Sequence, residues 1–392
     1  MKRRSFLLST GTIALGQLVV GCGTSQQAAL SVQLLNGSIP AQLTSKFTHE
    51  FKPAPQLNFT IAEQLKDLYT QLLSWKQLPE ETDNQKWQLP LPSWMKSHLP
   101  STKSQPKDLV TLGDYWLAPA IRQGLIQPLE PTQLSQWQKL PLRWQQLVKR
   151  NDKGELDPQG KVWAAPYSWG TTVIAYNRDK FKSLGWEPRD WSDLWRTEVR
   201  DRLSLLDQAR EVIGLTLKKL DKSYNTEQLE PLLPDLEREL VALNRQAKFY
   251  SSDTYLQPLI LGDTWLAVGW STDVWRAMQR YQQLAAVVPL SGTALWANMW
   301  VRPQGVNSSP FLSQKWIDFC WQLDVAQQIS RFSDATSPIP VPLNPADIPA
   351  EERSLLLNTS QVFHKSEFLL PLSTAALNQY ESLWRRIRQP MQ

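Results

Sequence analysis

Few side chains in this sequence are of the types that carry out catalysis or bind metals. Its 392 residues include three histidines and two cysteines, which are His49, His98, His364, Cys22 and Cys320. They are too few and too scattered for a zinc site, a cysteine–histidine pair or a disulfide framework. The Gly-x-Ser-x-Gly pattern of hydrolases is absent, and Cys320 lies in an apolar helical run where we expect it to pack. The sequence therefore predicts no enzyme, no metal site and no cofactor.

Tryptophan is unusually frequent, with 19 copies against roughly four for an average chain of this length. Aromatic faces must either pack or bind something. A tryptophan face attracts a cation by about 0.5–2 kcal/mol. A buried ammonium group also needs carboxylates to supply charge and hydrogen bonds. Tryptophans and acids brought together would therefore indicate a site for an amine.

Composition indicates a globular protein rather than a disordered or nucleic-acid-binding one. The chain is 42% hydrophobic and 20% charged with no low-complexity tract, which suits about two domains. Three of its 42 basic residues (Lys2, Arg3 and Arg4) belong to the N-terminal segment, and the other 39 nearly balance 37 acidic residues. We therefore expect no nucleic-acid surface.

The N-terminal segment has the pattern of an export signal. A basic start precedes an apolar run over 6–20, which is shorter than the roughly 20 residues of a spanning helix. We predict a signal peptide over 1–21. Arg3-Arg4-Ser-Phe-Leu resembles the twin-arginine signal, and Val-Val-Gly-Cys22 resembles the lipobox of bacterial lipoproteins. Cys22 is then the lipidated residue, 22–29 a tether, and the rest a soluble body held beside the membrane; the alternative is a stray thiol in a cleaved leader.

Strand and helix patterns alternate along the mature chain. In the first half, strands are predicted at 30–35, 57–61 and 108–112, and helices at 41–51, 65–75 and 115–125. The segment 78–107 is polar and rich in proline, which predicts a surface insertion with one helical turn at 94–98.

A second set of strands and helices follows a β-rich stretch at 162–177, where a Ser-Trp-Gly turn is predicted. Strands are predicted at 203–206, 265–270, 285–289 and 296–301, and helices at 191–196, 209–220, 226–243, 274–283, 313–332 and 373–388, with a proline-rich link at 337–340. Two α/β sets joined by crossing strands predict two lobes with a ligand cleft between them. Mixed sheets flanked by helices would form lobe 1 (30–170 and 297–335) and lobe 2 (171–296 and 336–392).

Four segments resemble the spermidine/putrescine-binding proteins of ABC importers. They are DLVTLGDYWLAPAIRQGLIQPL at 108–129, PYSWGTTVIAYN at 166–177 ending in WSDLW at 191–195, LLDQAREVIGLTLKKL at 205–220, and VGWSTDVW followed by VVPLSGTALWANMWVRP within 268–303. The resemblance runs from about Leu30 to the C-terminus. It implies a type II periplasmic-binding-protein-like fold that closes over a polyamine-like solute and docks on a membrane permease. It also implies a monomer in the periplasm or cell envelope.

The resemblance implies a ligand site built from aromatic and acidic residues. Trp270 and Asp273 match the family's Trp-x-x-Asp, and Glu211 matches a second carboxylate. Trp296 matches a second stacking tryptophan. The remaining matches are Tyr115, and Trp169 with Thr171 beside the first crossing. The alternative for each is a core aromatic or a solvated helix charge.

Several positions depart from the family pattern. Asn298 stands where an Asp is usual, Gln208 where an acid is frequent, Gly113 where a Ser is usual, and 36–40 is a shortened stretch. Asp114 and Asp273 would add charge. Stranding a buried charge costs about 3–5 kcal/mol, so a ligand with fewer ammonium groups, or one that uses amides at Gln208 and Asn298, is expected.

The leading hypothesis is a lipid-anchored solute receptor of an ABC importer for a polyamine or similar amine. One alternative is a two-lobed receptor for another small polar solute. Another is an interaction protein with a degenerate site, whose contact surface is the 78–107 insertion. An envelope enzyme is the rival class, and it lacks a nucleophile with a neighbouring histidine.

Overall fold

The computed structural model describes residues 30–51, 54–76, 105–333, 335–342, 346, 353–356 and 360–389. The expected signal peptide, Cys22, the tether and most of the 78–107 insertion, including its predicted helical turn, lie outside the described residues.

A parallel three-stranded unit begins the fold. Strand β1 (Leu30–Leu35) lies between β2 (Leu57–Ala62) and β3 (Leu109–Gly113). The strands alternate with helices α1 (Ala41–His49), α2 (Leu65–Lys76) and α4 (Asp114–Arg122). Every second residue of β1 is buried, as the apolar alternation requires. The strands and helices predicted for this half are confirmed.

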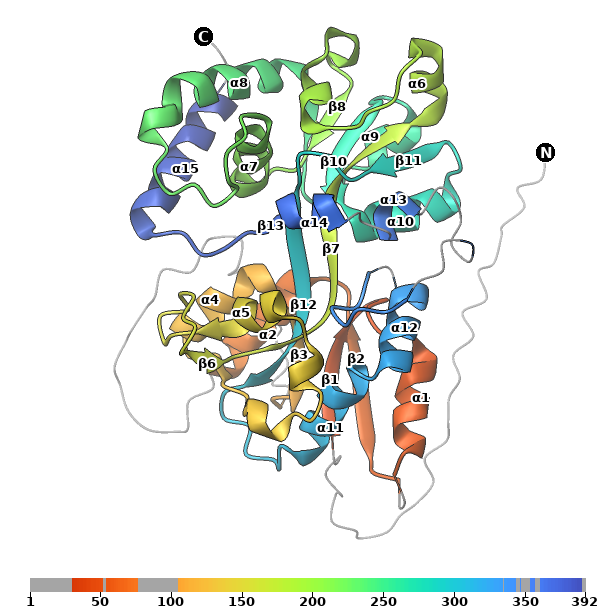
Figure 1. Ribbon diagram of the computed structural model, residues 1–392, viewed down its shortest axis with the longest axis vertical. Helices are drawn as coiled ribbons and strands as arrows, with labels where there is room; N and C mark the ends of the chain where they lie inside the picture. Colours follow the sequence, from red (N-terminus) through yellow and green to blue (C-terminus); the bar gives the residue numbers. More distant parts are fainter. Residues whose placement is uncertain are drawn as a thin grey trace, which may run out of the picture.

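Two long antiparallel strands, β7 (Ala165–Asn177) and β12 (Ala294–Pro303), connect the lower and upper halves of the molecule (Figure 1). All 13 residues of β7 are buried. Its first part pairs with β12, and its last part pairs with β10 (Leu266–Trp270) and β11 (Leu284–Val287). The main sheet runs in the order β2-β1-β3-β12-β7-β10-β8-β9, with β8 at Leu203–Leu205 and β9 at Ala247–Tyr250. This is the expected mixed α/β sheet.

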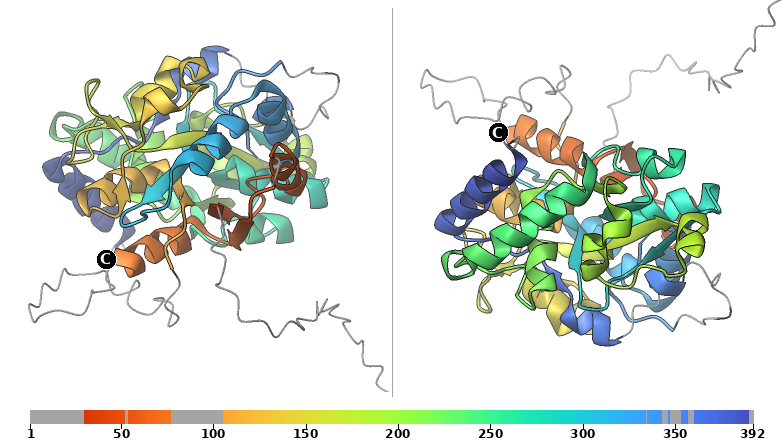
Figure 2. Two further views of the ribbon diagram at one scale, coloured as in Figure 1. Left: turned by 90° about the horizontal axis from the view of Figure 1, so that it is seen from below. Right: turned by 90° about the horizontal axis from the view of Figure 1, so that it is seen from above.

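Helices surround the central strands in the views from below and above (Figure 2). The upper half carries α7 (Ala209–Lys219), α8 (Leu233–Gln246), α10 (Ser271–Arg280) and α15 (Thr374–Arg388). The other helices are α5 (Leu142–Val148), α6 (Arg178–Leu184), α9 (Gln257–Leu261), α11 (Phe311–Cys320), α12 (Leu323–Phe332), α13 (Arg353–Leu356) and α14 (Ser360–Lys365). Short 3₁₀ helices lie at Pro131–Gln133, Trp137–Lys139, Trp191–Trp195, Thr197–Val199 and Glu230–Leu232. The minor strands are β4 (Ile126–Gln127), β5 (Lys149–Arg150), β6 (Lys161–Val162) and β13 (Glu367–Phe368).

Much of the tryptophan excess is used in packing. Trp300, Trp316 and Trp321 are fully buried in the core of the lower half, and Trp191 is fully buried in the upper half. One core in the lower half and two in the upper half are consistent with two lobes. Ile339 and Phe368, which the predicted boundaries assign to lobe 2, pack in the lower core. The lobe boundaries remain a proposal.

Three local predictions are wrong. No turn occurs at Ser-Trp-Gly, because β7 continues straight through Gly170. Helix α8 begins at Leu233 rather than 226, with Pro234 in its first turn, where proline's missing N–H costs nothing. The segment 313–332 is two helices, α11 and α12, which are separated at the buried Trp321.

Within the described residues, no helix combines the length and apolarity needed to cross a membrane.

Candidate functional site

One face of the crossing strands gathers candidate site residues. Trp296 lies opposite Gly170, and Asn298 lies opposite Ser168. Because side chains alternate along a strand, these four positions and Thr172 share one face. The side chains of Trp169 and Thr171 belong to the opposite face. The Trp169 indole donates to the Ser337 carbonyl at 3.1 Å, and its ring contacts Trp144 and Phe363. The structure therefore does not bring Trp169 together with Trp296.

The indole of Trp296 rests against the backbone of β7. Its Nε1 donates to the Thr171 carbonyl at 3.3 Å. A Cβ at Gly170 would lie 2.2 Å from Cζ2 of Trp296 and 2.4 Å from Oγ of Ser271. Gly170 is therefore required for this close approach. The indole stays half-buried, so part of its face remains accessible.

Glu211 lies in the first turn of α7 and is 4% exposed. Oγ1 of Thr172 lies 3.2 and 3.1 Å from its two carboxylate oxygens. Burial raises the pKa of Glu211 to about 7, although hydrogen bonds from Thr172 and Trp270 and the charge of Arg210 lower it. Trp270, the last residue of β10, pairs with Thr172. The structure thus brings Glu211 and Trp270 together.

Asp114 supplies a second, partly buried carboxyl group from the lower half. It begins α4, and its Oδ1 accepts the Ala297 N–H at 3.0 Å. Burial raises the pKa of Asp114 to about 7, despite that hydrogen bond and the charge of Arg150. The charge of Asp114 in turn raises the pKa of Glu211.

Helices α4 and α7 come from opposite halves, and both contact β12. In Figure 1, α4 lies below α7, and both helices are on the same side of that strand. Tyr115, the residue after Asp114, is 57% exposed and lies near enough to Arg210 of α7 to affect its pKa. The carboxyl groups of Asp114 and Glu211 thus share a region in which the ionised form of each is unfavourable.

Asp273 and Trp270 both form hydrogen bonds with Tyr255, a residue that the sequence analysis missed. The Tyr255 hydroxyl donates to Oδ2 of Asp273 at 2.9 Å and accepts the Trp270 N–H at 3.1 Å. Its ring meets the Trp270 ring edge-on at 5.9 Å. A Cβ at Gly269 would lie 1.8 Å from the Tyr255 ring, so this glycine admits the tyrosine. Nothing in the local spacing around Tyr255 indicated this role.

Neutral polar atoms also line this region. Asn298 is 3% exposed, and its Nδ2 donates to Ser168 Oγ at 3.2 Å. In the part of the chain that the structure describes, Asn298 Oδ1 is buried without a hydrogen-bond partner, and so is Thr171 Oγ1 on the opposite face of β7. Gln208 precedes α7 without capping it. In the 36–40 stretch, the Asn36 carbonyl accepts from Arg276 of α10 at 3.0 Å.

Neither catalysis nor metal binding is indicated by the remaining groups. Across the described ranges, no group of three or more His, Cys, Asp or Glu could hold a metal ion. Cys320 ends α11 at 1% exposure, which confirms that it packs. Burial raises the pKa of its thiol well above the ordinary value, so it is not a thiolate nucleophile.

A family model described as "Bacterial extracellular solute-binding protein" matches residues 104–361. The putrescine-binding periplasmic protein PotF of Escherichia coli (strain K12) is 28% identical over 237 residues, covering 57% of this chain and 62% of that protein. A spermidine/putrescine-binding periplasmic protein of Salmonella typhimurium (strain LT2) is 27% identical over 240 residues, covering 60% and 65%. The chain thus spans less than two thirds of the length of these relatives.

Solved structures share the fold over most of the chain. The spermidine/putrescine substrate-binding protein PotD from Streptococcus pneumoniae has a TM-score of 0.71 at 19% identity, covering 92% of this chain and 98% of that chain. The TpPotD lipoprotein of Treponema pallidum has a TM-score of 0.63 at 16% identity, covering 92% and 99%. The expected type II periplasmic-binding-protein fold is confirmed. Together with the family match over most of its length, this fold makes the chain a member of the bacterial extracellular solute-binding proteins.

Proposed function

We propose that this protein is the receptor of an ABC importer for a small organic cation of the polyamine class. The observation that carries the proposal is the pair of carboxyl groups of Glu211, which is buried, and Asp114, which is partly buried. They come from opposite halves of the fold, both have a pKa of about 7, and the charge of one raises the pKa of the other. A cation between them would offset both desolvation and mutual repulsion.

Aromatic side chains complete the site. Trp296 and Trp270 are half-buried beside these carboxyl groups, and each face offers about 0.5–2 kcal/mol of cation–π attraction while packing against methylene groups. Tyr115 and Asp273 extend the site on either side. We place Trp169 and the Thr171 side chain behind it, as support for the crossing strand.

The number of acids indicates the charge of the ligand. Asn298 is an amide, and Arg150 and Arg210 add positive charge near the two carboxyl groups. A ligand with one or two ammonium groups suits this balance better than a tricationic one. The printed names of the relatives, which include binding proteins for putrescine and for spermidine/putrescine, support the chemical class.

The cellular setting follows from the same proposal. A signal peptide over 1–21 directs export, Cys22 carries lipid, and residues 22–29 tether a monomeric receptor in the cell envelope. The two lobes close over the solute, and the closed form delivers it to membrane permease subunits. A relative of the same fold is itself described as a lipoprotein, which supports the anchor.

A second candidate is a receptor for a more polar, less charged solute. The unpartnered buried Asn298 Oδ1 favours it, because such an atom needs a hydrogen-bond partner. An interaction protein with a degenerate site is the other alternative.

A thermal-shift screen of the mature protein against diamines, triamines, amino acids and oligopeptides separates these functions. A bound ligand at 100 times its Kd adds about 2.7 kcal/mol of stability. We expect diamines such as putrescine to stabilise most. Stabilisation by amino acids or peptides without any response to amines would contradict the proposal, and no response to any class would favour the degenerate site.

A further inference from the structure

The first turn of α7, which carries Glu211, is held by a side chain rather than by a helix cap. Gln208 at the N-cap position makes no side-chain capping hydrogen bond. Arg210 is 9% exposed. Its Nη1 donates to the Leu370 carbonyl at 3.2 Å, and its Nη2 donates to Oδ1 of Asn225 at 2.9 Å. The guanidinium is thus directed toward the segment that follows β13.

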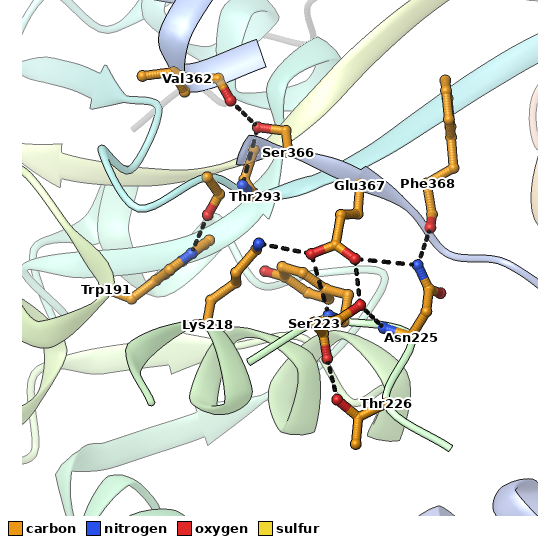
Figure 3. A network of polar contacts seen from close by, with 12 residues as sticks. Trp191, Lys218, Ser223, Asn225, Thr226, Thr293, Val362, Ser366, Glu367 and Phe368 are labelled. Atoms are coloured by element: carbon orange, nitrogen blue, oxygen red, sulfur yellow. Dashed lines mark hydrogen bonds and ion pairs between the residues drawn. The ribbon is translucent and has the colours of Figure 1, made fainter. Parts of the chain in front are cut away.

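Asn225 binds that segment as a neighbouring strand would. Its Nδ2 donates to the Phe368 carbonyl at 2.9 Å, and its Oδ1 accepts the Leu370 N–H at 2.8 Å. Figure 3 shows Asn225 reaching Phe368 beside Glu367. The same Oδ1 also accepts from Arg210. One amide therefore fixes both the chain at 368–370 and the arginine.

The other end of α7 is bound to the same segment. Lys218 Nζ lies 2.6 Å from Oε1 of Glu367, and both side chains are largely buried (Figure 3). Glu367 and Phe368 form β13, which pairs with the crossing strand β12. Phe368 packs in the lower core, whereas Leu369 packs against the upper core. The segment 367–370 thus lies where the two halves join.

The contacts of Arg210 with Asn225 and Leu370 keep its guanidinium from pairing with Glu211. Arg210 immediately precedes Glu211 in the first turn of α7, so a free guanidinium would pair with the carboxylate and compete with a ligand's ammonium group. We propose that Asn225 is a positioning residue of the ligand site: it holds the Arg210 guanidinium against segment 368–370 and leaves Glu211 available to the ligand. This inference rests on the proposed function, because it takes Glu211 as the partner of the ligand cation.

Several groups influence Glu211 and set its pH dependence. Arg210 of its own helix lowers its pKa and Asp114 of α4 raises it, while Thr172 of β7 and Trp270 of β10 donate hydrogen bonds. Tyr224 and Tyr255 lie within electrostatic range of it. A released Arg210 that pairs with Glu211 would lower the pKa of Glu211 further. Amine binding would then weaken, and its pH midpoint would move to lower pH.

The test is calorimetric titration of the full mature chain with putrescine across the range from about pH 5.5 to 9. Asn225→Ala should weaken binding about tenfold and lower the pH midpoint by about one unit. Asn225→Asp keeps an acceptor for Arg210 and should bind within about threefold of the parent. The double variant Asn225→Ala with Arg210→Gln should regain most of the lost affinity, because no competing cation remains.

The matched control is Gln379→Ala. Gln379 of α15 accepts the Leu229 N–H at 3.2 Å, so its loss loosens the connection between α7 and α8 without touching Arg210. It should leave the pH midpoint unchanged.

Parent-like binding by Asn225→Ala, or an affinity loss without a shift of the midpoint, would overturn the inference. Should Asn225→Ala not fold, Arg210→Gln alone decides: it should bind within about threefold of the parent above pH 8 with a raised midpoint, and lost binding would overturn the inference.

Glu211→Gln separates the two proposals. Unchanged putrescine binding by this variant would refute the proposed site itself. If Glu211→Gln abolishes binding while Asn225→Ala does not weaken it, the proposed function stands and only the positioning role of Asn225 fails.

Discussion

Replacing Glu211 with glutamine should stabilise the unliganded protein at neutral and higher pH while removing its affinity for amines. The carboxyl group is 4% exposed, and burial raises its pKa from 4.5 to about 7. A raised folded-state pKa means that the fold favours the neutral form. Its contribution to stability is fully present below about pH 4.5 and is lost as the pH rises through about 7. The gap between those pKa values corresponds to about 3 kcal/mol above that range.

Urea unfolding of the parent and of Glu211→Gln at about pH 5 and about pH 8 measures this difference. Glutamine keeps an oxygen that can accept from Thr172 but carries no charge to desolvate. We expect the variant to gain about 1–3 kcal/mol relative to the parent at about pH 8 and little at about pH 5. The control is Glu198→Gln, because Glu198 is an exposed partner of Arg196, and it should show no such gain.

The result that refutes this reasoning is a Glu211→Gln protein that is less stable than the parent at about pH 8. That outcome would mean that groups of the protein already stabilise the ionised Glu211 carboxylate, so a bound cation is not needed to do so. Retained amine-induced stabilisation in the same variant would show that the ligand has another partner.

Four further predictions test other parts of the account. Gly170→Ala places a methyl group 2.2 Å from the Trp296 ring; it should cost about 1–3 kcal/mol in urea unfolding and weaken amine binding, and parent-like affinity would mean that this tryptophan does not contact the ligand. Asn298→Asp adds a carboxylate near Asp114 and should improve spermidine binding relative to putrescine in calorimetry, whereas an unchanged preference would remove charge as the basis of selectivity. Cys22→Ala should release or trap an unlipidated precursor in cell fractionation, and unmodified Cys22 on membrane-bound mature protein would contradict the anchor. Small-angle scattering should show compaction on saturation with ligand, and identical curves would argue against closing lobes.

Much of the fold followed from residue periodicity. The alternating pattern of β1, the apolar run of β3 and the helical spacing between them predicted these elements. Crossing strands between two lobes were predicted, and the structure shows β7 and β12 paired directly. Cys320 was expected to pack because it lies among apolar residues at helical spacing.

Other features depend on contacts between distant segments. Gly170 looked like a turn residue, yet its role is to admit the Trp296 ring, and that contact is set by strand register rather than by local sequence. Tyr255 reaches Trp270 from a separate loop. The bond between Arg210 and Asn225 spans a helix and the loop after it, so no spacing rule identifies it.

The candidate site was predictable in its residue types more than in its geometry. Glu211 lies beside Trp270, Trp296 rests on β7, and Asp114 accepts a hydrogen bond from Ala297 of β12. That these residues form one ligand site stays a prediction. The side chain of Trp169 lies on the other face of β7, because strand alternation separates it from Gly170.

Calorimetric titration of the mature protein with putrescine and with spermidine tests the central claim most directly. The buried Glu211 and the partly buried Asp114 beside tryptophan faces predict saturable binding of one amine per chain, with a Kd below about one millimolar for putrescine. The affinity should rise as the pH increases through about 7, where Asp114 and Glu211 ionise. Absence of binding by either amine at millimolar concentration at about pH 8 would contradict the account.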